Sequence, residues 1–185
     1  MTKSKLLQPD LFLGDTILRL TPNILQENNI KGLILDVDET LVPIREAGVS
    51  QALLQWVEQI RPIATIWLVS NNVSEYRIGS IARSINLPYL LGAVKPSRKK
   101  LRLAVEAMNL PPSQVAMVGD RLFTDVLAGN RLGLFTILVE PMLDPAIATR
   151  SYPIRNFEVW ISKKLGVSLT YAQQNFTNPD KTSSN

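Results

Sequence analysis

The sequence contains no cysteine and no histidine. Disulfide bonds, thiol nucleophiles, imidazole acid–base chemistry and the usual zinc sites are therefore excluded. No apolar run reaches the roughly 18 residues that a membrane-spanning helix requires. The basic start of the chain is interrupted by Pro9 and Asp10, which does not fit a signal peptide. We therefore expect a cytoplasmic protein without a transmembrane segment, in which any catalysis uses carboxylates, hydroxyls, lysine, arginine and a bound metal.

The residues that are present are typical of one folded domain. The chain has 185 residues, of which 45% are hydrophobic and 19% are charged, so it is long enough for a single full core. The net charge of +4 favours anionic partners. The sequence contains no nucleic-acid-binding module, and no nucleic-acid partner is predicted. It makes no prediction of the oligomeric state.

Buried strands alternate with helices along most of the chain. The stretch 33–35 is apolar without alternation, as expected for a parallel strand that is covered on both faces. The patterns predict strands at 32–36, 64–69, 89–91, 115–118 and 134–139 and helices at 50–61, 74–85, 97–108, 123–132 and 156–165. Ser74 is a candidate N-cap, and Thr21-Pro22 predicts the start of a further short helix. The alternation predicts an α/β, Rossmann-like parallel five-stranded sheet with helices on both faces.

Polar side chains follow directly on the carboxyl ends of four predicted strands. In chain order these residues are Asp36, Asp38, Ser70, Asn71, Lys95, Asp120 and Asp125. Because the carboxyl ends of parallel strands lie at one edge of a sheet, we expect the seven residues to converge on one crevice. Each of them also has an ordinary structural interpretation: Ser70 as a helix cap, Lys95 as a solvated lysine, Asp120 as a turn residue.

Carboxylates, a hydroxyl and an ammonium without imidazole suit phosphoryl transfer that is assisted by a metal. An aspartate can attack phosphorus, and a second carboxylate can pass a proton to the leaving oxygen. Asp36 and Asp38 would repel each other if unpaired, so a hard divalent ion such as Mg2+ is the expected partner. A calcium loop fits poorly, because Thr40 and Leu41 stand where that motif needs an acidic or amide ligand and a glycine.

Four ordered motifs resemble those of the haloacid dehalogenase (HAD) phosphohydrolases. They are Asp36-Val37-Asp38-Glu39-Thr40, then Ser70, then Lys95-Pro96, then Gly119-Asp120 with Asp125. The resemblance covers about residues 30 to 140. It implies a phosphatase that depends on Mg2+ and works through an aspartyl-phosphate intermediate.

The resemblance also implies a role for each residue. Asp36 would be the nucleophile, and Asp38 would act as acid and then base while its backbone carbonyl binds Mg2+. Thr40 would support Asp38, and Lys95 would screen the charge of Asp36 and the phosphoryl group. The remaining roles are phosphate binding by Ser70 and the amide of Asn71, metal binding by Asp120, and for Asp125 either a ligand through water or an anchor behind the ligands.

A narrower resemblance is to the YqeG family of HAD subclass IIIA, over most of residues 10 to 145. The residues that carry it are 32–36, the block 118–126, Gly129-Asn130-Arg131 and the approach through Thr21-Pro22. Glu39 departs from the asparagine that many such sequences carry. Divergent members of this family include phosphatidylglycerophosphate phosphatases, so this lipid is the expected substrate through resemblance.

We divide the chain into three parts. Residues 1–30 form an N-terminal segment that packs on the core or lies at a membrane surface. Residues 31–168 form the HAD-like phosphatase domain. Residues 169–185 are polar with little to bury, and we expect a disordered tail.

The spacing of the motifs predicts an open site. Only about 33 residues separate Asp36 from Ser70, and 24 separate Ser70 from Lys95, so neither interval can hold a large cap domain. An open site suits a phosphate on a large substrate, such as a lipid at an anionic membrane surface. A phosphatase of soluble sugar phosphates or nucleotides and a non-catalytic phosphate-binding module remain alternatives. The basic group of Arg98, Lys99, Lys100 and Arg102 is either a docking site for anionic lipid or a solvated helix face.

Overall fold

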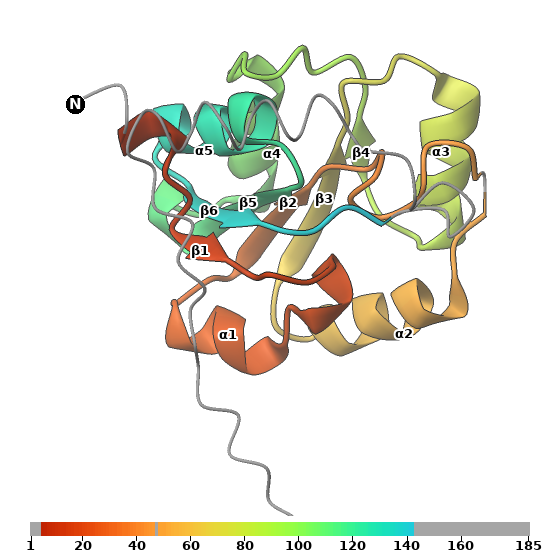
Figure 1. Cartoon of the computed structure of the whole chain (residues 1–185), viewed down its shortest axis with the longest axis horizontal. Helices are drawn as coiled ribbons and strands as arrows, with labels where there is room; N and C mark the ends of the chain where they lie inside the picture. The colour runs from red at the N-terminus through yellow and green to blue at the C-terminus, as the bar shows by residue number, and fades with distance from the viewer. Residues whose placement is uncertain (1–4, 47, 143–185) are drawn as a thin grey trace, which may run out of the picture.

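The computed structural model of the chain describes residues 5–46 and 48–142 (Figure 1). Its centre is a sheet of parallel strands in the order β1-β6-β5-β2-β3-β4. The strands are β1 (Leu11–Phe12), β2 (Gly32–Leu35), β3 (Thr65–Val69), β4 (Tyr89–Leu90), β5 (Val115–Gly119) and β6 (Phe135–Leu138). The predicted helix at 156–165 and the predicted tail at 169–185 lie outside the described residues.

Helices connect the strands and cover the sheet on both faces. They are α1 (Pro22–Glu27), α2 (Gln51–Ile60), α3 (Glu75–Ser84), α4 (Lys99–Met108) and α5 (Leu127–Leu132). The side chains of Thr21, Ser50 and Ser74 accept hydrogen bonds from the first turns of α1, α2 and α3, as N-cap residues do. The predicted Thr21 and Ser74 caps are thus confirmed. The helix predicted at 123–132 begins as a π-helical turn, Leu122–Val126, and continues as α5.

Two hydrophobic layers hold the sheet between the helices. Leu33 and Leu35 of β2 pack with α1, α2 and α3 on one face, and Ile34 packs with α4 and α5 on the other. In Figure 1, α1 and α2 lie below the sheet and α4 and α5 above it. The parallel sheet with helices on both faces therefore confirms the predicted fold class. No helix among the described residues is long and apolar enough to cross a membrane.

The sheet has six strands where the sequence predicted five. The additional strand is β1, which lies in the N-terminal segment and pairs with β6. Asp10 holds this pairing, because its carboxylate accepts hydrogen bonds from the backbone N–H and the hydroxyl of Thr136, at 2.7 and 3.0 Å. The Thr136 hydroxyl is also 3.1 Å from the Asn130 side-chain oxygen, and the Asn130 amide donates to the carbonyls of Leu6 and Gln8.

The rest of the described N-terminal segment packs on the core. Ile17, Leu20 and Leu25 are fully buried and belong to the same cluster as α2. The indole N–H of Trp56 donates to the Leu20 carbonyl at 2.8 Å. These contacts place residues 5–30 against the sheet and α2.

We predict that Asp10→Ala lowers the free energy of unfolding by about 1–2 kcal/mol, because it removes two hydrogen bonds that join β1 to β6. Urea denaturation would measure the loss. Glu58→Ala is the matched control, since its ion pair with Arg61 is exposed and such pairs contribute less than about 1 kcal/mol. Equal stability of the Asp10→Ala variant and the wild type would contradict the inference that Asp10 stabilises the pairing of β1 with β6.

Candidate active site

The carboxyl ends of the strands bring the predicted polar residues to one edge of the sheet. Asp36 follows β2, Ser70 follows β3, and Asp120 follows β5. The backbone N–H of Asp36 donates to the Val118 carbonyl at 3.0 Å, so the ladder between β2 and β5 continues to the first residue of the site. Asp36 is therefore fixed by the sheet itself.

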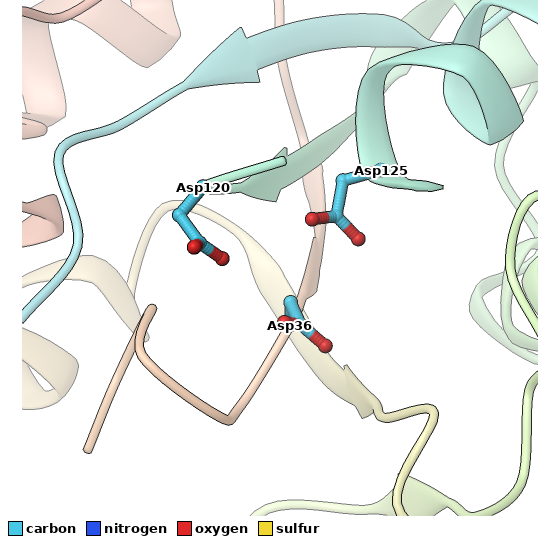
Figure 2. Close-up of side chains that lie close together, drawn as sticks. All are labelled: Asp36, Asp120 and Asp125. Carbon is cyan, nitrogen blue, oxygen red and sulfur yellow. The ribbon is translucent and has the colours of Figure 1, made fainter. Parts of the chain in front are cut away.

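Three aspartates face one another at this edge (Figure 2). Asp36, Asp120 and Asp125 each offer a carboxylate oxygen, and these oxygens lie within 4.8 Å of one another. Their side chains are at most 11% exposed. Buried carboxylates at this spacing could hold a divalent cation through oxygen ligands.

Lys95 supplies the one ammonium that lies among these carboxylates in the described part of the chain. Its Nζ is 2.6 Å from Asp36 Oδ1, 2.7 Å from Asp125 Oδ1 and 3.0 Å from the Val69 carbonyl. Burial alone would lower the pKa of Lys95, but the charges of Asp125 and Asp36 together raise it above its usual value. Burial raises the pKa of Asp36 to about 6, although Lys95 opposes the shift. Lys95 therefore stays charged, whereas burial makes the neighbouring Asp36 carboxylate harder to ionise.

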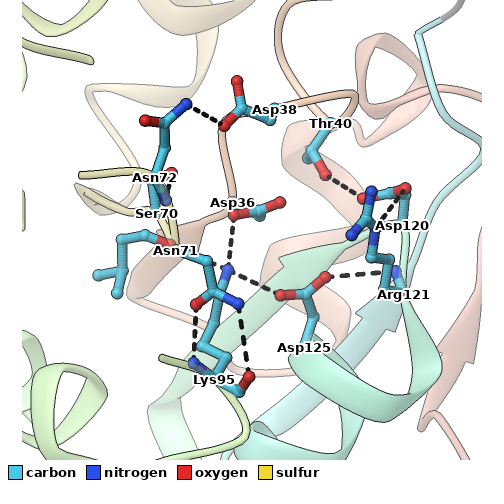
Figure 3. Close-up of polar contacts among 11 residues, drawn as sticks. Asp36, Asp38, Thr40, Ser70, Asn71, Asn72, Lys95, Asp120, Arg121 and Asp125 are labelled. Carbon is cyan, nitrogen blue, oxygen red and sulfur yellow. Dashed lines mark hydrogen bonds and ion pairs between the residues drawn. The ribbon is translucent and has the colours of Figure 1, made fainter. Parts of the chain in front are cut away.

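Asp125 is held from the side opposite Lys95 (Figure 3). It lies in the π-helical turn after β5, and its Oδ2 accepts a hydrogen bond from the Arg121 backbone N–H at 3.2 Å. Its carboxylate packs so closely on Gly119 that a methyl group there would collide with it. The glycine at the end of β5 is therefore required by the position of Asp125.

Asp120 follows the end of β5 and is supported by the segment after β2. The hydroxyl of Thr40 donates to Asp120 Oδ1 at 3.1 Å, and Arg121 lies 3.8 Å from Asp120 Oδ2. Arg121 also forms an ion pair with Glu39 at 3.0 Å. Burial and the charges of the neighbouring aspartates raise the pKa of Asp120 to about 8. The resemblance to the HAD phosphohydrolases implied that Thr40 supports Asp38, whereas the Thr40 hydroxyl contacts Asp120.

The carboxylate of Asp38 points away from those of Asp120 and Asp125 and toward Asn72 (Figure 3). Arg77 binds Asp38 Oδ1 at 2.9 Å, and the side-chain amide of Asn72 donates to Asp38 Oδ2 at 3.0 Å. The sequence pattern did not predict Arg77, since nothing in the helical pattern of α3 marks one arginine for a carboxylate 39 positions earlier. Asn72 follows Ser70 and Asn71 directly, and this proximity was the available signal.

Ser70 and Asn71 lie beside the lysine. The buried Ser70 hydroxyl accepts a hydrogen bond from the Asn72 N–H at 3.0 Å. The Asn71 side chain accepts from the Lys95 backbone N–H at 2.7 Å and donates to the Lys95 carbonyl at 3.4 Å. Asn71 thus fixes the backbone of the residue whose ammonium reaches Asp36.

Residues 93–141 match the family model described as HAD-hydrolase-like. Over 139 residues the chain is 37% identical to the protein named Probable phosphatase YqeG of Bacillus subtilis (strain 168), an alignment that covers 75% of this chain and 80% of that protein. The chain belongs to the YqeG family of HAD-type phosphatases. This membership confirms the family and the enzyme class that the four motifs indicated.

Other similarities agree with the YqeG assignment. The chain is 26% identical over 128 residues to phosphatidylglycerophosphate phosphatase 1 of Arabidopsis thaliana. This alignment covers 64% of this chain but only 37% of that longer protein. A crystal structure from Streptomyces avermitilis MA-4680, assigned to the HAD hydrolases, matches with a TM-score of 0.50 and 18% identity over 74% of this chain and 88% of that one. The latter similarity supports the fold alone.

We predict that Gly119→Ala destabilises the protein by about 1–3 kcal/mol, because the added methyl group overlaps the Asp125 carboxylate. Thermal and urea unfolding would measure the change. Gly48→Ala is the control, since a methyl group there meets nothing within 4 Å. Unchanged stability of Gly119→Ala would contradict the described position of Asp125.

The raised pKa values of Asp36 and Asp120 predict that the metal-free protein loses stability as the pH rises. Between about pH 4 and 8 the folded state binds more protons than the unfolded state, so the free energy of unfolding falls, by about 1.4 kcal/mol per pH unit for each excess proton. Urea denaturation in chelator at several pH values would measure the slope. Asp120→Asn should flatten it above pH 6, and an unaltered slope in that variant would contradict the assignment.

Proposed function

We propose that the protein is an Mg2+-dependent phosphomonoester hydrolase that works through an aspartyl-phosphate on Asp36. The observation that carries the proposal is the burial of three carboxylates around a single lysine. If all of them are charged, the cluster has a net charge of about −2, which a divalent cation would offset. The raised pKa of Asp120 supports this deficit of positive charge.

Asp36, Asp120, Asp125 and the backbone carbonyl of Asp38 are the proposed metal ligands, with Asp125 acting directly or through water. When bound there, Mg2+ would withdraw charge from the phosphoryl oxygens. Thr40 would orient the Asp120 carboxylate that it contacts. All these donors are oxygen atoms, the ligands that Mg2+ prefers.

Asp36 is the proposed nucleophile. Its ion pair with Lys95 favours the ionised form that attack on phosphorus requires, in opposition to the effect of burial. Attack forms a bond from the carboxylate oxygen to phosphorus and breaks the ester bond to the leaving oxygen. Lys95, Ser70 and the amide of Asn71 would stabilise the transferring phosphoryl group.

Asp38 is the proposed acid and base. It would give a proton to the leaving oxygen and later take one from the water that hydrolyses the aspartyl-phosphate. Arg77 and Asn72 hold its carboxylate at the side of the site that faces α3. Asp38 and Asp36 lie two residues apart in the chain, but their carboxylates have different partners. Asp38 contacts Arg77 and Asn72, whereas Asp36 contacts Lys95.

Phosphatidylglycerophosphate is the proposed substrate. The Arabidopsis relative is named as a phosphatase of this lipid, and the intervals between the motifs leave no room for a large cap. A phosphate on a lipid headgroup can reach an open site without a lid. This substrate would place the protein in phosphatidylglycerol synthesis, at the surface of a membrane.

The test is phosphate release from detergent-dispersed phosphatidylglycerophosphate and from a panel of soluble sugar phosphates and nucleotides, with Mg2+ or with chelator. We expect release from the lipid that requires Mg2+. Asp36→Asn should lower kcat at least about a thousandfold, because it removes the nucleophile. Asp15→Asn is the control, since Asp15 is half exposed and pairs with Arg19.

Each alternative has its own result in this test. Preferential hydrolysis of a soluble phosphate would replace the lipid as substrate. No release from any compound, together with equal phosphate binding by the wild type and the Asp36→Asn variant, would favour a non-catalytic phosphate-binding module.

A further inference from the structure

Exposed apolar side chains gather at the edge of the sheet that carries the site. Four of the five large hydrophobic residues that are exposed in the described part of the chain lie in the segments that follow β2, β3 and β4. These four, which we call the apolar rim, are Ile44, Val73, Tyr76 and Val94, and they are 54% to 84% exposed. The same segments carry Asp38, Ser70 and Lys95.

Val94 and Val73 lie in neighbouring segments, which follow β4 and β3. Val94 directly precedes Lys95, whose ammonium contacts Asp36. A methyl group on Gly92 would lie 3.4 Å from Val73, so Val73 packs over the turn that leads to Val94. These two valines therefore project from neighbouring segments beside the buried lysine.

Arg77 links the other two rim residues. Tyr76 precedes Arg77 in α3, and Arg77 binds the Asp38 carboxylate. The same guanidinium donates to the carbonyls of Pro43 and Glu46, which flank Ile44. Ile44 and Tyr76 thus belong to two segments that are tied together next to Asp38.

The backbone at Val94 supports a functional reason for the rim. Its φ is +51°, in the left-handed region that β-branched residues rarely adopt. Such a conformation is strained for a residue with a side chain, and Val94 is 71% exposed, so packing within the fold offsets little of the strain. Strain of this kind concentrates at binding sites.

Basic residues lie at the start of α4 and at the end of α5. We call Arg98, Lys99, Lys100, Arg102 and Arg131 the basic collar. Arg98 donates to the Arg131 carbonyl at 3.0 Å, and Arg131 donates to the Pro96 carbonyl at 3.1 Å. The collar is therefore anchored to the residue that follows Lys95, and its charge lies close to the rim.

We propose that the apolar rim and the basic collar dock the protein on an anionic lipid bilayer, with the site facing the headgroups. The inference deepens the proposed function, because it names the surface on which a lipid substrate would be presented. Apolar side chains flanked by cations are the usual pattern of interfacial binding, and tyrosine is favoured at membrane interfaces. Charge complementarity selects an anionic bilayer over a neutral one.

Vesicle sedimentation tests the docking without turnover. The full chain would be mixed with vesicles of phosphatidylcholine, alone or with phosphatidylglycerol, and we expect binding only to the mixed vesicles. The double variant Val73→Ser/Tyr76→Ser should lose about tenfold in partition coefficient. Lys99→Glu should lose about fivefold or more, given the usual contribution of one basic residue at an anionic surface.

Lys31→Glu is the matched control for charge, since Lys31 is exposed and precedes β2 at the opposite edge of the sheet. It should bind like the wild type. Equal binding by all variants, or equal binding to neutral and anionic vesicles, would overturn the inference. Self-association that the double variant abolishes, with vesicle binding unchanged, would make the rim a protein interface and would also overturn it.

Hydrolysis in detergent separates this inference from the proposed function. If the wild type hydrolyses dispersed phosphatidylglycerophosphate with Mg2+ but does not bind vesicles, the proposed function stands and the docking surface is wrong. If it binds anionic vesicles but releases no phosphate, the docking surface stands and the proposed function is wrong. The double variant should retain the wild-type rate in detergent. A matching loss of rate there would overturn the inference, because the two substitutions would then act on the site and not on docking.

Discussion

The ammonium of Lys95 allows two aspartates to be buried side by side at the end of a hydrophobic sheet. Its contacts with Asp36 and Asp125 balance part of a charge that the core could not otherwise accommodate. The Val69 carbonyl and the Asn71 side chain fix where the ammonium lies. Because one lysine serves two carboxylates, the position of each acidic group depends on the other, and the proposed chemistry depends on both.

The fold could largely be predicted from the sequence because most of its elements are marked locally. Continuous apolar runs mark the central strands, and Ser74 marks the start of α3 with its own hydrogen bond. β1 carried no such mark. It has two residues, and its pairing depends on Asp10 reaching Thr136, 126 positions along the chain. Local patterns do not contain a contact of that kind.

The site divides in the same way. That Asp36, Lys95 and Asp120 gather at one edge follows from parallel topology, which the alternation of strands and helices implies. The directions of the side chains do not follow from it. Glu39 has a φ of +67°, and the turn it forms carries Thr40 to Asp120, while Asp38 is bound by Arg77 on α3. Such partners are chosen by turn geometry and helix packing, which only the folded chain specifies.

Among the described residues, the outer strands of the sheet are β1 and β4, and they have two residues each. This part of the chain therefore offers no long row of free backbone groups to another chain. In contrast, four of the five exposed large hydrophobic residues of this part of the chain lie in the segments that carry the site. This arrangement disfavours strand pairing with another chain, but it still permits binding through exposed side chains. Short outer strands therefore let this part of the chain expose apolar side chains with less risk of strand-to-strand aggregation.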